Sequence, residues 1–220
     1  MNQMGLDIFP NEVVSLIGPN GAGKTTLFNI ISGITKPDSG EISFNGRPVT
    51  GYPSWKMAEL GVGRTFQNIR LFRDLSVFEN IALAQTGSAL HRLRINDVEE
   101  LLNRFDILEV ANVSAGSLPY GIRRRVELAR AMARDPKIIL LDEPTAGMNP
   151  TEAQELIVIV KGLVSIGISI LLIEHNMNVA MGAGDRIVVM DLGKKIAEGS
   201  PSEVQKNPIV IKAYLGAQTG

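Results

Sequence analysis

The chain has 220 residues, of which 45% are hydrophobic and 20% charged, and its net charge is −1. This length suits one domain with a substantial core, and the balanced charge excludes a general attraction to nucleic acid or an acidic membrane surface. No cysteine is present, so disulfides and thiolate ligands or nucleophiles are excluded. The sequence has neither a signal-peptide pattern nor an apolar run of about 18 residues, so we expect a cytosolic protein that does not span a membrane.

Two short strands are predicted at the start, over residues 6–9 and 13–17, with a Pro-Asn turn between them. The second strand leads into Gly-Pro-Asn-Gly-Ala-Gly-Lys-Thr at 18–25, and a helix is predicted over 26–31. The octapeptide fits G-x-x-x-x-G-K-[ST] at every fixed position, in the strand–loop–helix setting that a phosphate-binding loop requires. Its glycines let backbone N–H groups point inward at an anion, and the following helix adds the positive end of its dipole.

This loop predicts a site for the phosphates of a nucleotide. Lys24 could reach the β- and γ-phosphates, and the Thr25 hydroxyl could hold Mg²⁺. We expect nucleotide contacts along the whole loop and the first helical turn. The predicted nucleotide-binding residues there are Gly18, Pro19, Asn20, Gly21, Ala22, Gly23, Lys24, Thr25 and Thr26.

Short elements follow the predicted phosphate loop. A turn cluster at 36–40 precedes a predicted hairpin over 41–47, whose turn is Asn-Gly. A short helix is predicted over 57–60, and a strand is predicted over 62–66, directly before Gln67.

Helical spacing of apolar residues dominates from residue 75 to about 116. His91 lies in a polar part of this block, and we interpret it as a surface residue. We expect a single domain over 1–220 in which residues 75–116 form an inserted helical subdomain. The α/β body would then comprise 1–74 and 117–220.

The second half of the chain alternates helices with apolar strands. Residues 138–141 form a continuous apolar run, which is typical of a strand buried on both faces. This alternation indicates a mostly parallel, doubly wound sheet, and so the α/β class. The other predicted elements are helices over 123–134, 152–164, 177–181 and 202–216 and strands over 168–173, 186–190 and 196–198.

Two neighbouring carboxylates, Asp142 and Glu143, come directly after the apolar run. They are expected at the carboxyl edge of the sheet, where ligands bind in open α/β sheets. Asp142 could hold Mg²⁺ directly or through water, and Glu143 could polarise an attacking water as general base. His175 ends the next predicted strand in the same row, so we expect it to contact the γ-phosphate.

These motifs resemble those of ABC-type ATPases, and the resemblance covers nearly the whole chain. Residues 18–25 match the family's Walker A motif, 138–143 its Walker B motif and 146–150 its D-loop. Gln67 matches the Q-loop glutamine and His175 the switch histidine. The resemblance implies a P-loop NTPase fold with a mostly parallel core sheet, a small antiparallel β subdomain and the helical insertion.

The resemblance also assigns chemical roles. It implies an ATPase that binds ATP and Mg²⁺. Lys24, Gln67, Glu143 and His175 match catalytic positions. Thr25, Gln67 and Asp142 match the positions that hold Mg²⁺.

The segment Leu-Pro-Tyr-Gly-Ile-Arg at 118–123 occupies the place of the family signature, usually L-S-G-G-Q. In the family this segment binds the γ-phosphate held by the opposite subunit. The resemblance therefore implies a head-to-tail homodimer or heterodimer with two shared ATP sites, and nucleotide contacts from Pro119, Tyr120 and Gly121. Pro119 and Ile122 replace the usual serine and glutamine, so one phosphate-binding hydroxyl is lost.

Segments at 63–72, 75–80, 174–177 and 210–216 resemble the ATPases of branched-chain amino-acid importers, nearest the LivG type. The ATPases of urea importers and of the lipopolysaccharide exporter share much of this pattern and remain alternatives. The resemblance implies a motor subunit bound peripherally at the cytoplasmic face of the cell membrane. Its partners would be integral-membrane permease subunits, a second ABC ATPase subunit and, indirectly, a periplasmic or extracellular solute-binding protein.

The permease is expected to dock near Gln67 and the block 69–83. We expect Ile69, Leu71 and Phe72 to form an exposed apolar cluster there, because such clusters mark interfaces. The alternative is that these side chains are buried locally.

Two other protein classes fit less well. A soluble ABC ATPase of DNA repair or translation would bind nucleic acid, and the arginines at 123–125, 130 and 134 could favour it. Such proteins usually carry long inserted coils or two ATPase halves, and we interpret these arginines as a solvated or phosphate-near face. A small-molecule P-loop kinase would not combine the signature, Q-loop and switch histidine. We therefore expect no nucleic-acid partner.

The start of the chain departs from the family pattern. The family stacks adenine on an aromatic residue of an earlier strand, whereas Phe9 falls within the predicted strand over 6–9 and not on such an earlier strand. We therefore expect a chain that starts one strand late and discriminates poorly between ATP and GTP. The missing strand would leave an unprotected sheet edge at 6–9.

Overall fold

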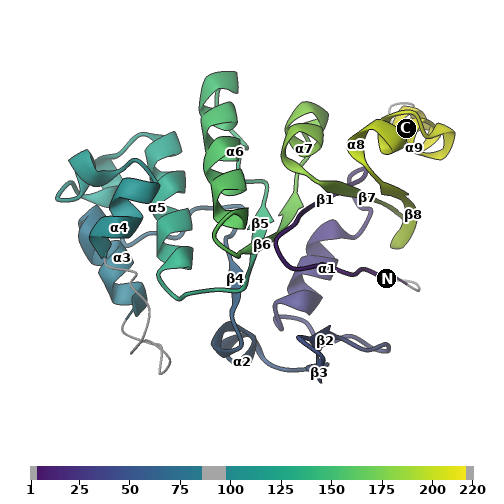
Figure 1. Ribbon diagram of the computed structural model, residues 1–220, viewed down its shortest axis with the longest axis horizontal. Coiled ribbons are helices and arrows are strands. Elements are labelled where there is room, and N and C mark those ends of the chain that lie inside the picture. Colours follow the sequence, from purple (N-terminus) through teal and green to yellow (C-terminus); the bar gives the residue numbers. More distant parts are fainter. Residues whose placement is uncertain (1–3, 86–97, 217–220) are drawn as a thin grey trace.

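A six-stranded sheet forms the centre of the computed structural model, which describes residues 4–85 and 98–216 (Figure 1). The strand order is β4-β5-β6-β1-β7-β8, with only the β7–β8 pair antiparallel, so the predicted mostly parallel sheet is confirmed. The strands are β1 (Val13–Ile17), β4 (Val62–Arg64), β5 (Ile138–Asp142), β6 (Ser169–Ile173), β7 (Arg186–Asp191) and β8 (Lys194–Gly199).

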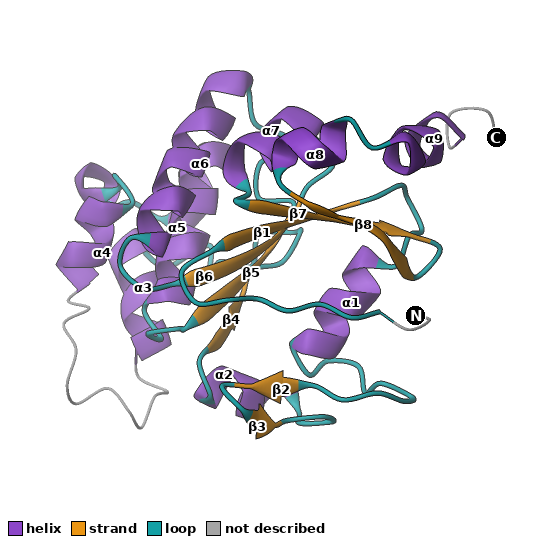
Figure 2. Ribbon diagram, turned by 45° about the vertical axis from the view of Figure 1, so that its right-hand side comes forward, coloured by secondary structure: helices purple, strands orange, loops and turns teal. Residues whose placement is uncertain are grey.

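Helices cover both faces of this sheet, with α1 on the face opposite α6 and α7 (Figure 2). The described helices are α1 (Lys24–Ile31), α2 (Ser54–Glu59), α3 (Val77–Gln85), α4 (Val98–Arg104), α5 (Tyr120–Met132), α6 (Pro150–Val164), α7 (Met177–Ala183), α8 (Pro201–Gln205) and α9 (Pro208–Gly216), with short 3₁₀ turns at Leu108–Val110 and Ala115–Ser117. None of the helices in these ranges is long and apolar enough to cross a membrane.

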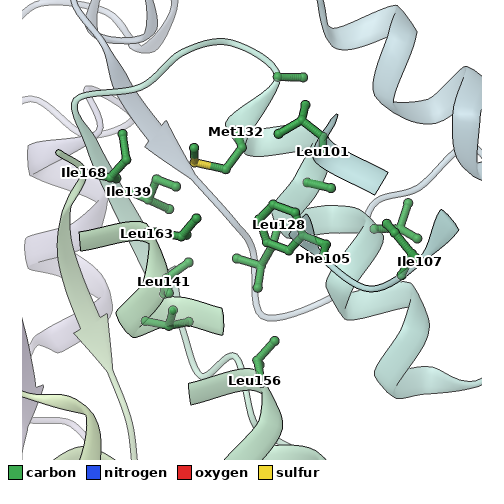
Figure 3. Close-up of a cluster of buried hydrophobic side chains, with 14 of the residues drawn as sticks. Leu101, Phe105, Ile107, Leu128, Met132, Ile139, Leu141, Leu156, Leu163 and Ile168 are labelled. Atoms are coloured by element: carbon green, nitrogen blue, oxygen red, sulfur yellow. The ribbon is translucent and has the colours of Figure 1, made fainter. Parts of the chain in front are cut away.

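Alternate residues of the buried strands belong to different hydrophobic clusters. In β5, Ile139 and Leu141 pack with Leu163 and Met132 from the covering helices (Figure 3). Leu140 points the other way and belongs to the cluster that contains Phe28 of α1. This alternation follows from the two-residue period of a strand. Because each face of the sheet packs against a hydrophobic cluster, consecutive residues of the strand have to be apolar.

A small hairpin stands apart from the main sheet. β2 (Ser43–Phe44) and β3 (Arg47–Pro48) pair antiparallel, as predicted. Asn45 and Gly46 form the turn with φ values of 49° and 74°, the left-handed backbone that Asn-Gly turns provide.

Helices α3 and α4 both contact α5 and lie with it at one side of the molecule (Figure 1). The helices expected between 75 and 116 are therefore present. The division of the chain into a body and a helical subdomain stays a prediction, and His91 lies outside the described residues.

Residues 6–9 are not a strand, so the predicted strand and sheet edge there were wrong. Side chains bind this backbone instead: Arg186 Nη2 donates to the carbonyl of Asp7 at 2.6 Å, and Ser169 Oγ donates to that of Phe9 at 3.1 Å. The outer strands of the described sheet are β4 and β8. The predicted single helix over 202–216 is two helices, because Pro208 has no N–H with which to continue α8.

Candidate functional site

The site begins at the carboxyl end of β1, in the glycine-rich loop. A Cβ added to Gly18 would lie 2.1 Å from the carbonyl oxygen of Met190, so β7 leaves no room for any side chain here. Gly23 precedes α1 with a φ of 99°. It has no side chain to cap the helix, so the first-turn N–H groups of α1 remain available to an anion.

Lys24 is buried within the curve of this loop, with 6% of its surface exposed. Its Nζ donates to the carbonyls of Gly18 at 2.6 Å and Pro19 at 3.1 Å. Burial lowers the pKa of Lys24, and the carboxylates of Glu143 and Asp142 oppose this shift. Lys24 therefore lies close enough to the two carboxylates for their charges to interact.

Strand register brings the loops after β5 and β6 together at the same edge. Asp142 pairs with Ile173 across these strands, and Leu16 of β1 also lies beside Ile173. Asp142 is 5% exposed, and burial raises its pKa. Arg64, whose Nη2 lies 3.6 Å from Asp142 Oδ2, opposes this shift.

Glu143 has a left-handed backbone, with a φ of 49°. This conformation costs a non-glycine residue roughly 1–2 kcal/mol, so contacts with its surroundings have to stabilise the backbone of Glu143. Its N–H donates to the carbonyl of Ile173 at 3.0 Å, and its own carbonyl accepts from Ala146 at 3.2 Å. Strained backbone at a carboxylate beside a phosphate loop is typical of functional sites.

Three predicted residues meet at the Glu143 carboxylate. His175 Nε2 lies 2.6 Å from Oε1, and Gln67 Nε2 donates to Oε2 at 3.2 Å. The Glu143 side chain is 18% exposed and that of His175 44%, so water can reach the cluster. This arrangement can orient a water molecule against a phosphate held in the loop.

The residues present fit a Mg²⁺ ion that takes most of its ligands from phosphate and water. Asp142 offers a buried carboxylate, and Thr25 exposes its side chain in the first turn of α1. Within the described ranges no group of three or more His, Asp or Glu side chains could hold a metal alone. Mg²⁺ is commonly bound by one or two carboxylates together with substrate phosphates, which this donor set matches.

The signature residues sit at the start of α5, where Pro119 is the N-cap. Gly121 is buried, and a Cβ added to it would lie 3.3 Å from Glu152 Oε1 of α6. Tyr120 is half-buried, with its hydroxyl 3.4 Å from Arg124 Nη2. Arg124, directly after this segment, donates to the Glu143 carbonyl at 3.3 Å and so connects the start of α5 to the cluster described above.

The α5 arginines were expected on a solvated or phosphate-near face. The solvated alternative was wrong for Arg124, which is fully buried, and the phosphate-near alternative stays a prediction. Backbone carbonyls from distant loops surround the Arg124 guanidinium, and these acceptors carry no signal in the local sequence. Arg64 and Glu174 were also not predicted from the sequence as residues of the site. Arg64 Nη1 donates to Asn29 Oδ1 at 2.8 Å in addition to its ion pair, and Glu174, also buried, accepts from Thr145 Oγ1 at 2.7 Å. A charged residue placed in or directly after an apolar strand was the one available signal for both.

Two family descriptions match the chain. "ABC transporter" matches residues 1–146, and "Branched-chain amino acid ATP-binding cassette transporter" matches residues 194–219. The high-affinity branched-chain amino acid transport ATP-binding protein LivG of Escherichia coli (strain K12) is 43% identical over 98% of this chain and 91% of its own. The corresponding protein BraF of Pseudomonas aeruginosa is 42% identical with the same coverage.

Solved structures agree with the sequence comparison. The ADP conformation of MJ1267, an ATP-binding cassette of an ABC transporter, has a TM-score of 0.85 at 30% identity, covering 96% of this chain and 90% of that one. The ATP-binding cassette MJ0796, dimeric and bound to ADP and Pi, has a TM-score of 0.78 at 28% identity, with coverages of 90% and 89%. The phosphate loop and the strand-end carboxylates agree with these matches, which show that the chain belongs to the ATP-binding proteins of the ABC transporter family.

Proposed function

We propose that the chain is the ATP-hydrolysing motor subunit of an importer of branched-chain amino acids. The observation that carries the chemistry is the contact of Gln67 and His175 with the Glu143 carboxylate, beside the lysine of the phosphate loop. The similarity to LivG and BraF over 98% of the chain supports the class of solute.

In this proposal the loop from Gly18 to Thr26 holds the phosphates of ATP, with Lys24 on the β- and γ-phosphates. Glu143 takes a proton from the attacking water, and His175 contacts the γ-phosphate and positions the carboxylate. Thr25, Gln67 and Asp142 would hold Mg²⁺, which neutralises charge developing on the phosphates. Burial of Lys24 and Asp142 strengthens their interaction with these charges, because water screens them less.

The active unit is proposed to be a dimer of ABC ATPase subunits, identical or related. Pro119, Tyr120 and Gly121 of each subunit would contact the nucleotide of the other across a head-to-tail interface. The helix that begins at Tyr120 presents its positive end there. We propose that the dimer binds permease subunits at the cytoplasmic face of the membrane, that a solute-binding protein acts through the permease, and that nucleic acid plays no part.

A cavity of about 260 Å³ near the site is the proposed position for a permease segment. It lies between β4, α2, α3 and α5, with Phe66 just before Gln67 in its wall. Of the expected exposed cluster, Phe72 is 56% exposed, whereas Ile69 is half-buried and Leu71 packs against the core. Phe78 of α3 adds a further exposed ring, at 44%.

Purification of the tagged chain from its own membranes, followed by transport in proteoliposomes, tests this function. We expect permease subunits to co-purify and ATP-dependent uptake of radiolabelled leucine to occur, and the Glu143→Gln variant to abolish the uptake. Uptake of urea in place of leucine, extraction of lipopolysaccharide or co-purification of nucleic acid without a permease would each overturn the proposal.

A further inference from the structure

Arg124 is a charged side chain with none of its surface exposed, on a helix that otherwise carries half-buried arginines. Its Nη1 donates to the carbonyl of Phe66 at 2.8 Å, and its Nη2 donates to the carbonyl of Gln67 at 3.1 Å and to that of Glu143 at 3.3 Å. One nitrogen therefore bridges the backbones of two residues that the proposed mechanism brings together. Gln67 and Glu143 are 76 positions apart in the chain, and their side chains meet at 3.2 Å.

We propose that Arg124 is a positioning residue for ATP hydrolysis, which sets the loops of Gln67 and Glu143 relative to each other. The inference rests on the proposed roles of these two residues. A planar guanidinium can donate along several fixed directions at once, which a lysine ammonium cannot reproduce. Arg124 itself is assigned no contact with nucleotide; it acts through the two backbones that it binds.

The strained backbone of Glu143 shows why such support is needed. A residue with a φ of 49° persists in that conformation only where its surroundings over-determine it. The Glu143 carbonyl accepts from Arg124 and from the N–H of Ala146, while its own N–H binds the carbonyl of Ile173. Without the guanidinium, one of these three restraints is lost, and the carboxylate can turn away from the Gln67 amide.

Glu127 is the counter-ion that holds the guanidinium in place. Its Oε2 accepts from Arg124 Nη1 at 2.6 Å, and its side chain is 2% exposed. Burial raises the pKa of Glu127. The charges of Arg124 and Arg130 and a hydrogen bond from the backbone of Arg70 oppose this shift. Glu127 also lines the 260 Å³ cavity that is the proposed position for a permease segment.

Two substitutions separate positioning from folding. Arg124→Lys keeps the charge beside Glu127 but loses the bridge between the two loops. The double variant Arg124→Met/Glu127→Met removes the whole ion pair, and replacing a buried pair by apolar side chains of similar size is often neutral or stabilising. Arg125→Gln is the matched control, because the neighbouring Arg125 pairs with exposed carboxylates of Asp106 and Glu155.

The experiment measures single-turnover hydrolysis of radiolabelled ATP at saturating concentration and, separately, the affinity for the analogue AMP-PNP. We expect a fall in rate of about 10- to 100-fold in both variants, the size of effect that a displacement of roughly 1 Å causes. Analogue affinity is expected to stay close to that of the wild type, and Arg125→Gln to match the wild type in both measurements.

A folded double variant that hydrolyses ATP at the wild-type rate would overturn the inference. So would a loss of analogue affinity that parallels the loss of rate in Arg124→Lys, because general disorder of the site would then explain both. Glu143→Gln is measured beside them: wild-type turnover in that variant contradicts the proposed function itself, rather than the role of Arg124.

Discussion

Replacing Glu143 by glutamine tests the proposed general base, because the shape is kept and only the carboxylate charge is lost. The amide oxygen can accept from Gln67 Nε2, and the amide NH₂ can donate to His175 Nε2 when the imidazole carries its proton on Nδ1. The variant therefore replaces charge-assisted hydrogen bonds by neutral ones, which costs roughly 0.5–2 kcal/mol. Part of that is recovered from water, since the Glu143 side chain is 18% exposed.

The loss of rate is expected to be much larger than this loss of stability. A general base contributes about 10²- to 10⁴-fold, equivalent to roughly 2.7–5.4 kcal/mol at 1.36 kcal/mol per factor of ten. ATP binding should persist, because the phosphate loop around Lys24 is unchanged. Hydrolysis is what separates the proposed dimer, so an ATP-bound dimer should accumulate.

Three measurements on the same variant check this expectation: phosphate release, thermal unfolding and size-exclusion chromatography with ATP and Mg²⁺. The expected result is a small change in melting temperature, a loss of turnover of at least a hundredfold and an ATP-dependent shift to the dimer. Turnover at the wild-type rate would refute the assignment of Glu143. A loss of turnover matched by a large loss of stability would show that the carboxylate is structural.

Three further predictions follow from the contacts of the site. Burial raises the pKa of the Asp142 carboxylate and Arg64 opposes this shift, so in Arg64→Met that pKa should rise further. The acid limb of the pH–rate profile should then move to higher pH, and an unmoved acid limb would contradict the role of this ion pair. Gly18→Ala places a Cβ 2.1 Å from the carbonyl oxygen of Met190, whereas a Cβ at Gly21 meets nothing within 4 Å, so only Gly18→Ala should abolish AMP-PNP binding in a titration. Gly21→Ala should lower the stability measured by thermal unfolding by about 1–2 kcal/mol, because the φ of Gly21 is 79°. Phe72→Ser should reduce the amount of permease that co-purifies, and an unchanged yield would remove this ring from the proposed docking surface.

Much of the fold follows from local patterns in the sequence. The run 138–141 predicts a strand buried on both faces, since β5 has to present apolar side chains to two clusters. The phosphate loop is equally local, because its glycines and Lys24 stand at fixed spacing and the loop geometry depends on them. The strand-end positions of Asp142, Glu143 and His175 follow from the parallel sheet, which puts the carboxyl ends at one edge.

What the sequence did not predict depends on partners far along the chain. Residues 6–9 have a strand-like pattern, but their carbonyls are bound by Ser169 and Arg186, which no local pattern indicates. Arg124 was expected on a solvated or phosphate-near face, because a charged residue on a helix usually lies at the surface. Its acceptors are carbonyls of Phe66 and Gln67, supplied by a loop 58 and 57 positions away.

The position of β1 within the sheet has a consequence for synthesis on the ribosome. β1 comes first in the chain, yet it is hydrogen-bonded between β6 and β7, and the N–H of Val13 donates to Asp185, 172 positions later. At about 5–20 residues per second, those positions take roughly 10–35 s to translate. For most of that interval the apolar strand that leads into the phosphate loop has neither neighbour, because β6 begins only at Ser169. The nascent chain therefore presents an unpaired strand to chaperones, and β7, which packs against the phosphate loop, is absent until the last third of the protein has emerged.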